Sequence, residues 1–552
     1  MSTMTEKRKQ LARRLAKVWQ NDFEMKAVLP GIALSEEQMS VVLQDEDQML
    51  IQGAAGSGKS ITLLYKMLKV MEQEEGKRIL YCTFNWTLVQ HARKLFRQSA
   101  RYEELKDKHV VHFHTFHYMA AKLLKSIGVS VPTVVFTTQT ALRKHDDTVL
   151  RRVAAVFSRL MNTDWYRRLP AAQKLYSTHT YEFLKEEILW MKANGFVTEE
   201  AYLNCERTGR GHLPRLTKEQ RHTIFAGFQM YQADLKDRFN GDVDLEDYAL
   251  LLLKHMEEIP ESLKYDYVFV DEVQDLQPMQ LKALVMLAKR SLVLAGDSRQ
   301  RIYKRTPFSY KELGIRIEGR KNRILHTNFR STRQIMQLAE SLRFIDEEGE
   351  RDSAAHYPRN GPLPQIRYFA DIAAHNQFII QTIKEKWKED PAKTVAVIHR
   401  FDGDLFRERN SKIFFDLNRE FELITTEQYG KRFDLARPRK PVFFTDAFSV
   451  KGLEFDVVFV LHFDRFHYPS ERRMEELKKR TSGEPSSEAF AQDEEQIRND
   501  EKKVLYVAMT RAKEALYLLY CNEKPIRISP FVRDFPCDCY EAYGFDKSMY
   551  CK

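Results

Sequence analysis

A glycine-rich segment of the chain has the residues needed to hold a nucleoside triphosphate. Residues 53–60 read GAAGSGKS and follow the apolar run MLI, so a strand leads almost directly into the glycines. The pattern G-x-x-x-x-G-K-S curls backbone N–H groups around phosphate oxygens, with a lysine for the outer phosphates and a serine hydroxyl for magnesium. The helix-like sequence ITLLYKMLKVM that follows supplies the helix amino end that such a loop requires. The predicted phosphate loop consists of Gly53, Ala54, Ala55, Gly56, Ser57, Gly58, Lys59 and Ser60.

Two adjacent acids further along the chain could serve the same nucleotide. The segment YDYVFVDEVQD ends an apolar, strand-like run in Asp271 and Glu272. A nucleotide hydrolase needs one carboxylate to position magnesium and another to orient or deprotonate the attacking water. Alone, an acidic pair after an apolar strand more often marks a solvated strand end. With the phosphate loop upstream, the catalytic interpretation is favoured.

Short apolar strands alternate with helical patterns twice along the chain. They read ILYCTF, VVHFHTF, YVFVDE and LVLAGD in the first half, then TVAVI, FELITT, VVFVLHF and ALYLLYC in the second. This alternation predicts an α/β fold with two parallel sheets wrapped in helices. Ligands of such folds gather at the carboxyl ends of the strands, which is where this chain places its polar, motif-like residues.

Two stretches interrupt these alternating patterns. Residues 118–241 are largely helical in pattern, basic and aromatic, and strands resume only at Tyr265, so we expect a helical insertion into the first sheet domain. The run from about 469 to 503 is polar and dense in charge, which is typical of a mobile loop or an exposed helix. The expected domains are therefore 1–117 with 242–316, the insertion 118–241, and 317–552.

Composition describes a soluble globular protein. The 552 residues exceed one ordinary core, and the net charge of +10 permits a polyanionic partner without requiring one. No run approaches 18 apolar residues, and the N-terminus lacks an apolar signal core, so we expect a cytoplasmic protein. The six cysteines are too sparse for a disulfide framework, which fits a reducing compartment.

Two groups of potential metal ligands deserve weighing against simpler interpretations. His112, His114 and His117 form H-x-H-x-x-H, but no carboxylate or cysteine partner is evident nearby. The C-terminal cysteines 537, 539 and 551 lack the second pair or histidine that a zinc site needs. For both groups a zinc site is the less favoured interpretation.

The order of short motifs along the chain resembles the superfamily 1A helicases, the UvrD, Rep and PcrA group. After LSEEQ come GAAGSGKS, TFNWTLV, HFHTFH, DEVQD, GDSRQRIY, NFRST, FSVKGLEFDVV and LYVAMTRAK, covering nearly the whole length apart from the helical insertion. The resemblance implies two RecA-like parallel-sheet domains in tandem. It also implies an ATP-dependent enzyme that moves 3′ to 5′ on single-stranded or tailed DNA, with ATP and Mg²⁺ as cofactors.

The resemblance implies a role for each acidic and phosphate-binding residue. Lys59 would serve the phosphates, Ser60 and Asp271 the magnesium, Glu272 the water, and Gln300 the terminal phosphate.

Further motif residues would complete the nucleotide site. Gln38 would read the adenine edge, Phe329 would stack on adenine, and Glu454 would meet the ribose. Arg330 and Arg511 would be arginine fingers supplied by the second sheet domain, a role worth about 10³–10⁵ in rate. Loss of the terminal phosphate would then let the two lobes separate.

The resemblance also implies contacts with nucleic acid, in part through aromatic side chains that stack on bases. The candidates are Phe84, Asn85, His114, Thr115, Tyr303, Arg305 and Ser449. For any one of these aromatics, ordinary core packing is the competing interpretation.

Two departures from the family pattern leave a second function open. After GDSRQRIY the relatives continue with glycine, tryptophan and arginine, whereas this chain has Lys304, Arg305 and Thr306. The interval from Thr332 to Pro441 leaves little room for the large 2B insertion of longer relatives. The alternative is an ATP-driven DNA-sensing switch that regulates a partner such as a nuclease, by analogy with phage-defence pairs.

Overall fold

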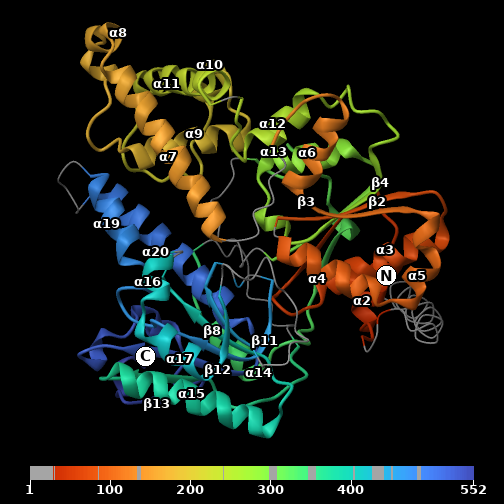
Figure 1. The fold of residues 1–552 in the computed structure, drawn as a ribbon, viewed down its shortest axis with the longest axis vertical. Helices are drawn as coiled ribbons and strands as arrows, with labels where there is room; N and C mark the ends of the chain where they lie inside the picture. The colour runs from red at the N-terminus through yellow and green to blue at the C-terminus, as the bar shows by residue number, and fades with distance from the viewer. Residues whose placement is uncertain are drawn as a thin grey trace, which may run out of the picture. The chain divides into compact units, whose positions relative to one another are not determined.

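The computed structural model describes residues 29, 32–84, 86–132, 139–239, 241–297, 308–345, 356–401, 404–425, 441–448, 450, 452–481 and 487–551. The chain divides into two compact units. The first contains Met1–Val135, Leu189–Phe196 and Asp242–Thr327; the second contains Phe136–Ile188, Val197–Gly241 and Asn328–Lys552. Each unit is built on one parallel sheet (Figure 1).

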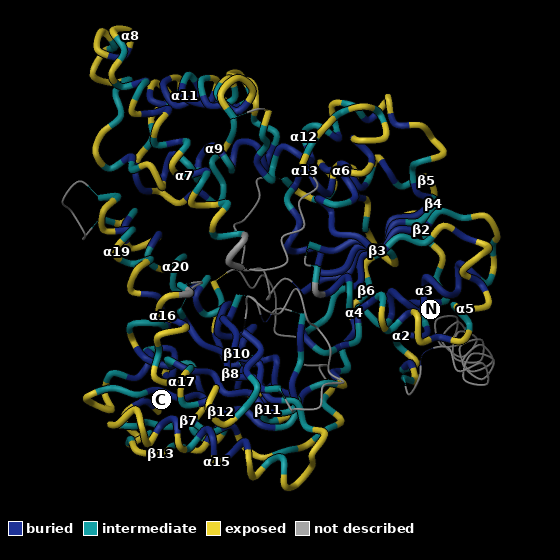
Figure 2. Tube along the Cα trace, viewed as in Figure 1, coloured by how far each residue is buried: buried dark blue, intermediate teal, exposed yellow. Residues whose placement is uncertain are grey.

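The first sheet has its strands in the order β3-β2-β4-β5-β1-β6, and every neighbouring pair is parallel. Its strands are β1 (Gln48–Gly53), β2 (Arg78–Thr83), β3 (Val110–Thr115), β4 (Tyr265–Val270), β5 (Ala288–Gly296) and β6 (Asn322–Leu325). The central strands are apolar on both faces because helices cover both faces of the sheet. They are the buried, dark blue segments of Figure 2.

Helices cover both faces of this sheet (Figure 1). One face packs against α2 (Glu36–Leu43), α3 (Lys59–Gln73), α4 (Trp86–Arg97) and α5 (Ala100–Leu105). The other packs against α6 (Phe116–Ser126), α12 (Asp247–Lys254) and α13 (Pro278–Leu287). The short strand β6 pairs with β1, so residues that we expected to open the second domain at 317 complete the first sheet instead.

The second sheet has the order β13-β7-β12-β11-β8-β10-β9, again with parallel neighbours. Its strands are β7 (Gln365–Phe369), β8 (Val395–His399), β9 (Glu422–Thr425), β10 (Pro441–Asp446), β11 (Phe455–Val460), β12 (Ala512–Cys521) and β13 (Glu541–Tyr543). Helices α15 (Ile372–Glu389) and α17 (Lys412–Glu420) share an apolar core with one face, α16 (Leu405–Arg409) precedes α17, and α14 (Arg333–Glu340) packs on β12. Two RecA-like parallel-sheet domains in tandem, as predicted, make up the fold.

The described part of the insertion is helical and largely belongs to the second unit. It contains α7 (Gln139–Met161), α8 (Asp164–Arg168), α9 (Tyr181–Asn194), α10 (Glu199–Asn204) and α11 (Lys218–Asp237). Glu187 of α9 is fully buried and accepts hydrogen bonds from Arg207, Arg210 and Tyr202 at 2.7–2.9 Å. These arginines outweigh the cost of burial and lower the pKa of Glu187.

The polar run at about 469–503, expected as a mobile loop or an exposed helix, forms two helices where the structure describes it. They are α19 (Glu471–Lys479) and α20 (Glu488–Met509), and α20 also packs on β11 and β12. The acid Glu501 of α20 is fully buried, where Arg400 (2.7 Å) and Arg473 (2.9 Å) pair with it. Part of the charge of this run is therefore buried in ion pairs, which composition does not distinguish from solvent exposure.

A carboxylate of α20 fastens the insertion to this helix pair. Asp493 accepts the backbone N–H of His212 (2.7 and 2.9 Å) and of Leu213 (2.8 Å). The side chain of Leu213 packs with Leu477 of α19 and Phe490 of α20. The segment of the insertion around His212 and Leu213 therefore packs with the α19–α20 pair within the second unit.

Replacing Asp493 with alanine should loosen this contact. Hydrogen bonds to a charged group contribute about 1.5–3 kcal/mol, so we expect the free energy of unfolding to fall by about that much. Amide hydrogen exchange at His212 and Leu213 should accelerate. The control is Glu494→Ala, which removes an ion pair with Arg498 within the helix, worth about 0.2–0.5 kcal/mol. Equal exchange in both variants would contradict this role for Asp493.

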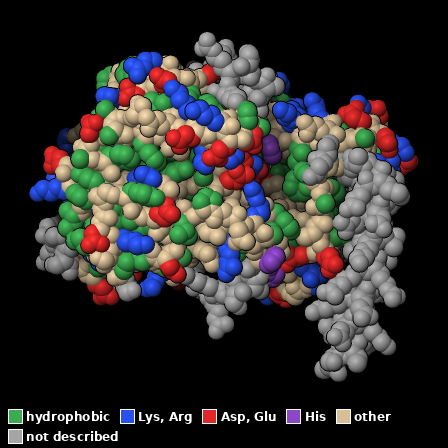
Figure 3. Space-filling model, turned by 90° about the horizontal axis from the view of Figure 1, so that it is seen from below, with side chains coloured by type: hydrophobic (Ala, Val, Ile, Leu, Met, Phe, Trp, Pro, Cys, Tyr) green, Lys and Arg blue, Asp and Glu red, His purple; other side chains and the backbone are tan. Residues whose placement is uncertain are grey.

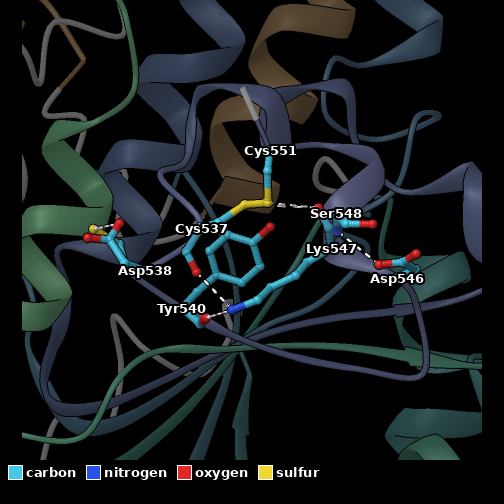
Figure 4. The surroundings of a disulfide bond; sticks show 8 residues. Cys537, Asp538, Tyr540, Asp546, Lys547, Ser548 and Cys551 are labelled. Carbon is cyan, nitrogen blue, oxygen red and sulfur yellow. Dashed lines mark hydrogen bonds between the residues drawn. A yellow bond between two sulfur atoms is a disulfide. The ribbon is translucent and has the colours of Figure 1, made fainter.

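The C-terminal segment is closed by a disulfide between Cys537 and Cys551 (Figure 4). Lys547 reinforces the turn by donating to the carbonyl oxygens of Cys537 (2.9 Å) and Tyr540 (3.5 Å). Sequence spacing gave no reason to expect this pair, because only folding brings residues 14 positions apart to a Cα separation of 5.7 Å. Within the described part of the chain, no helix has the length and apolar character needed to cross a membrane.

Candidate nucleotide site

The loop between β1 and α3 has the backbone of a phosphate cradle. Gly56 and Gly58 have φ values of 88° and 80°, a conformation that side chains disfavour, and Gly58 caps the 15-residue helix α3. A Cβ on Gly53 would lie 2.4 Å from Ser57 Oγ, so the close approach of the chain here also requires glycine. Because these glycines permit the tight turn, the amino end of α3 points into the loop.

Lys59 lies inside this loop. Its Nζ donates to the carbonyl oxygens of Gly53 (2.8 Å) and Ala54 (3.0 Å). The hydroxyl of Ser57 is buried and has no hydrogen-bond partner among the described residues. An oxyanion received by the loop would meet the lysine, this hydroxyl and the helix amino end, so the residues present suit phosphate.

Gln38 packs against the loop from α2. Its Nε2 donates to the carbonyl of Ser57 (3.1 Å), and its Oε1 accepts from the backbone of Ser35 (2.9 Å) as part of the helix capping box. A Cβ on Gly58 would lie 2.1 Å from this Nε2. An amide has two hydrogens and two lone pairs, so contacts with adenine would come in addition to these bonds.

The carboxylate of Asp271, at the carboxyl end of β4, faces the first turn of α3. Its Oδ2 accepts from Ser60 Oγ at 2.5 Å and from the hydroxyl of Tyr81 at 2.6 Å, and its Oδ1 accepts from the backbone of Glu272 at 3.0 Å. Burial and the neighbouring charge of Glu272 raise the pKa of Asp271.

Glu272 has a backbone conformation that marks a special position. Its φ of 53° and ψ of 48° lie in the left-handed region, which is costly for a residue with a side chain. Gln274 donates to the carboxylate of Glu272, and Gln274 Oε1 accepts from the backbone of Asp297 at 3.1 Å. The acid is thus oriented by a side chain that is itself fixed to the end of β5.

These groups suit a divalent cation. Two oxygen ligands, from Ser60 and Asp271, converge beside the phosphate loop, and oxygen donors are what magnesium prefers. A cation there would also offset the repulsion between the buried carboxylates of Asp271 and Glu272.

In the second unit, the NFRST segment forms a turn fastened to the start of β12. Asn328 Oδ1 accepts the backbone N–H of Arg330 (2.9 Å) and Ser331 (3.2 Å), and Ser331 Oγ donates to the carbonyl of Ala512 (2.6 Å). Phe329 is 43% exposed, as a ring that stacks on a ligand would be. The guanidinium of Arg330 forms an ion pair with Glu454.

Arg511 is buried beside this turn, with 1% of its surface exposed. It donates to the carbonyl oxygens of Val507 (2.9 Å) and Leu453 (3.2 Å) and to the hydroxyl of Thr510 (3.1 Å). Arg511 thus contacts Leu453, the residue that directly precedes Glu454 in the chain. Three motifs that are far apart in sequence, NFRST, KGLEF and MTRAK, therefore meet in the second unit.

The two sheets present their motif residues at opposite strand ends. In the first sheet the phosphate loop and Asp271 follow β1 and β4, at the carboxyl ends that we expected. In the second sheet Glu454 and Arg511 precede β11 and β12, which are paired in register at Phe455 and Ala512. The carboxyl-end rule therefore holds for the first site and not for this cluster.

The predicted nucleic-acid residues that the structure describes lie at the carboxyl ends of β2 and β3. Phe84 is half-buried against the core and packs edge-to-face with His117. Thr115 caps α6 by accepting the backbone N–H of Tyr118. His114 is buried with neither ring nitrogen hydrogen-bonded to a described residue, and burial together with the His112 charge lowers the pKa of His114 to about 3. Any contact that His114 makes at neutral pH is therefore that of a neutral imidazole.

Some predicted residues fall outside the part that the structure describes: Asn85, Gln300, Tyr303, Arg305 and Ser449. Motif reasoning also missed two residues, Tyr81 and Gln274. Gln274 was within reach of sequence, because DEVQD places it two residues after Glu272. The sequence gives no signal for Tyr81, because an aromatic residue in an apolar strand is typical of ordinary core packing.

The histidines of H-x-H-x-x-H serve packing and hydrogen bonding. The rings of His112 and His114 lie 5.0 Å apart, and His112 Nδ1 is 3.1 Å from the hydroxyl of Tyr265. Across the described ranges, no three His, Cys, Asp or Glu side chains gather as a metal site would require.

Comparison with known proteins identifies the family. The model of the UvrD/REP helicase N-terminal domain matches residues 34–305, and that of the UvrD-like helicase C-terminal domain matches 447–523. The ATP-dependent DNA helicase PcrA of Leuconostoc citreum is 24% identical over 387 residues, 66% of this chain and 47% of that protein. PcrA of Staphylococcus epidermidis is 22% identical over 391 residues, 66% of this chain and 48% of the other.

A third relative matches a shorter stretch at higher identity. The mitochondrial ATP-dependent DNA helicase HMI1 of Saccharomyces cerevisiae is 33% identical over 138 residues, 22% of this chain and 19% of that protein. The chain spans about half the length of the PcrA proteins that it matches. With both domain models matched in order over the two parallel-sheet units, the chain belongs to the UvrD/PcrA-like family of superfamily 1A helicases.

Proposed function

We propose that this protein is an ATP-dependent DNA helicase or translocase that moves 3′ to 5′ along single-stranded or tailed DNA. The observation that carries the proposal is the grouping of Ser60, Asp271 and Glu272 beside the phosphate loop. A loop, a metal carboxylate and a second oriented acid are the parts that triphosphate hydrolysis uses. The names of the PcrA relatives support ATP and DNA as ligands.

In this proposal each residue of the first unit has one task. Lys59 leaves the loop carbonyls to pair with the outer phosphates, and Glu272 orients or deprotonates the attacking water. Gln274 keeps Glu272 in place, so the acid needs little reorganisation. Magnesium, when bound by Ser60 and Asp271, supplies positive charge that stabilises the phosphate oxygens.

In this proposal the second unit supplies two arginines that bind the terminal phosphate of ATP. We assign Arg330 and Arg511 to that phosphate, Phe329 to adenine and Glu454 to the ribose. Arg330 would exchange its ion pair with Glu454 for the phosphate when ATP binds. Hydrolysis would remove this phosphate, and with it the anion to which the arginines and Lys59 bind. The protein would then change between an ATP-bound and an ADP-bound state, and this change would drive movement.

The net charge of the chain is compatible with DNA as a ligand, but the charge alone does not indicate which ligand binds. The net charge is +10, yet the face drawn in Figure 3 shows Lys and Arg side chains next to Asp and Glu. We therefore assign DNA binding to particular residues at the carboxyl ends of β2 and β3, and to stacking, rather than to the mixed-charge face drawn in Figure 3.

Strand separation of tailed duplexes tests the proposed polarity. With ATP and Mg²⁺, we expect the chain to unwind a duplex with a 3′ single-stranded tail and to leave a 5′-tailed or blunt duplex intact. The variant Glu272→Gln should unwind none of these three duplexes. Preference for the 5′ tail would overturn the assigned direction.

A second candidate function is an ATP-driven switch that binds DNA and regulates a partner such as a nuclease. It is favoured by the two departures from the family pattern: Lys304, Arg305 and Thr306 follow GDSRQRIY, and the interval from Thr332 to Pro441 leaves little room for a large 2B insertion. A switch would hydrolyse ATP on DNA without separating either tailed duplex. Robust unwinding by the isolated chain removes the need for this candidate.

A further inference from the structure

Tyr81 connects the core of the first unit to its metal carboxylate. It lies on β2, next to β4, the strand that Asp271 directly follows, and only 1% of its surface is exposed. Its ring packs against Phe113 with centroids 5.4 Å apart. Its hydroxyl donates to Asp271 Oδ2 at 2.6 Å, the same oxygen that accepts from Ser60 Oγ at 2.5 Å.

The surrounding structure leaves this hydroxyl one direction to point. The strands β2 and β4 are in register at Tyr81 and Phe269, and the backbone N–H of Asp271 donates to the carbonyl of Cys82 at 2.9 Å. A tyrosine ring has two side-chain torsions, and here core packing fixes both. A tyrosine hydroxyl carries one hydrogen, and here it donates that hydrogen to Asp271 Oδ2.

Ser60 and Tyr81 both donate to Oδ2, and a bound cation would affect these two hydrogen bonds differently. Ser60 and Asp271 would hold a divalent cation through lone pairs of their oxygens, so the Ser60 hydroxyl would no longer donate to Oδ2. The hydroxyl of Tyr81 comes from the core side and can keep its bond. The backbone N–H of Glu272 holds the other oxygen, Oδ1, at 3.0 Å.

We infer that Tyr81 is a positioning residue for the metal carboxylate, holding Asp271 in the orientation that meets Ser60 when a divalent cation and nucleotide bind. This role rests on the proposed nucleotide site. Groups that orient a metal ligand through a hydrogen bond typically change metal affinity about 10–100-fold when they are removed. Tyr81 should therefore act on metal binding and leave metal-free nucleotide binding unaltered.

The test uses the full chain with Tyr81→Phe, which removes one buried oxygen and keeps the ring. Binding of Mn²⁺ in the presence of saturating ADP is measured by electron paramagnetic resonance, and binding of ADP without metal by calorimetry. We expect Mn²⁺ affinity to fall by about tenfold or more, with the metal-free ADP affinity unchanged. The matched control is Tyr265→Phe: Tyr265 is also buried, opens β4 at the end far from Asp271, and contacts His112.

The outcomes separate the inference from the proposed function. If ADP does not improve Mn²⁺ binding to the wild-type chain, the nucleotide site itself is wrong. If the wild type responds and Tyr81→Phe behaves like Tyr265→Phe, only the role of Tyr81 is overturned. Should Tyr81→Phe fail to fold, a crystal structure of the wild type with ADP and Mn²⁺ decides. A separation between Tyr81 and Asp271 beyond about 3.5 Å would overturn the inference.

Discussion

Replacing Arg330 with alanine should lower the rate constant for ATP hydrolysis by about 10³-fold or more, with ATP affinity changed far less. A guanidinium that meets the terminal phosphate stabilises charge that develops in the transition state, a role worth about 10³–10⁵ in rate. The variant should fold, because the ion pair with Glu454 is partly exposed and such pairs contribute at most about 1 kcal/mol. Single-turnover hydrolysis and equilibrium binding of a fluorescent ATP analogue measure the two quantities.

Two companion variants make the Arg330 experiment specific. Arg330→Lys should recover little activity, because an ammonium lacks the planar fork of a guanidinium. Arg419→Ala removes an exposed arginine of the same unit, which pairs with Glu420 at 3.7 Å, and should hydrolyse ATP like the wild type. A hydrolysis rate of Arg330→Ala equal to that of Arg419→Ala would remove Arg330 from the proposed site.

Replacing Glu272 with glutamine should lower hydrolysis about 10²–10⁴-fold while ATP stays bound. The amide keeps the shape of the side chain and cannot accept a proton from water, which is the loss expected when a general base is removed. Folding should not suffer, because the substitution removes one of two buried, mutually repelling carboxylates. The measurements are the rate constant of hydrolysis, ATP affinity and the midpoint of thermal unfolding.

The control for Glu272 is Glu258→Gln in the same unit, an exposed acid that pairs with His255. It should leave hydrolysis and unfolding unchanged. An active Glu272→Gln enzyme would mean that another group handles the water.

The fold followed from the sequence where local patterns agree with tertiary structure. Runs such as VAVI and FDVVFV are apolar on both faces, which identifies strands covered by helices on both sides. For the α19–α20 run, composition predicted a mobile loop or an exposed helix and gave no sign of the buried acid Glu501, because composition does not show that Arg400 and Arg473 pair with it. The strand β6, of only four residues, likewise lacks a local signal.

The part of the candidate site that could be predicted is the part where the backbone conformation requires particular residue types. The phosphate loop needs glycines at positive φ and a lysine at the start of α3, so its sequence pattern is restrictive. Tyr81 acts through a side chain whose neighbours come from another strand, so its contact with Asp271 depends on the register of β2 and β4. The grouping of Arg330, Glu454 and Arg511 required both the resemblance to a family and the pairing of β11 with β12.

The rate of ATP hydrolysis by the isolated chain without nucleic acid, and with single-stranded DNA, duplex DNA or RNA at two salt concentrations, tests the central claim most directly. The account predicts that single-stranded DNA strongly accelerates hydrolysis and that the stimulation fades as salt rises, because backbone contacts release counterions. A hydrolysis rate that ignores single-stranded DNA at low salt would contradict the account.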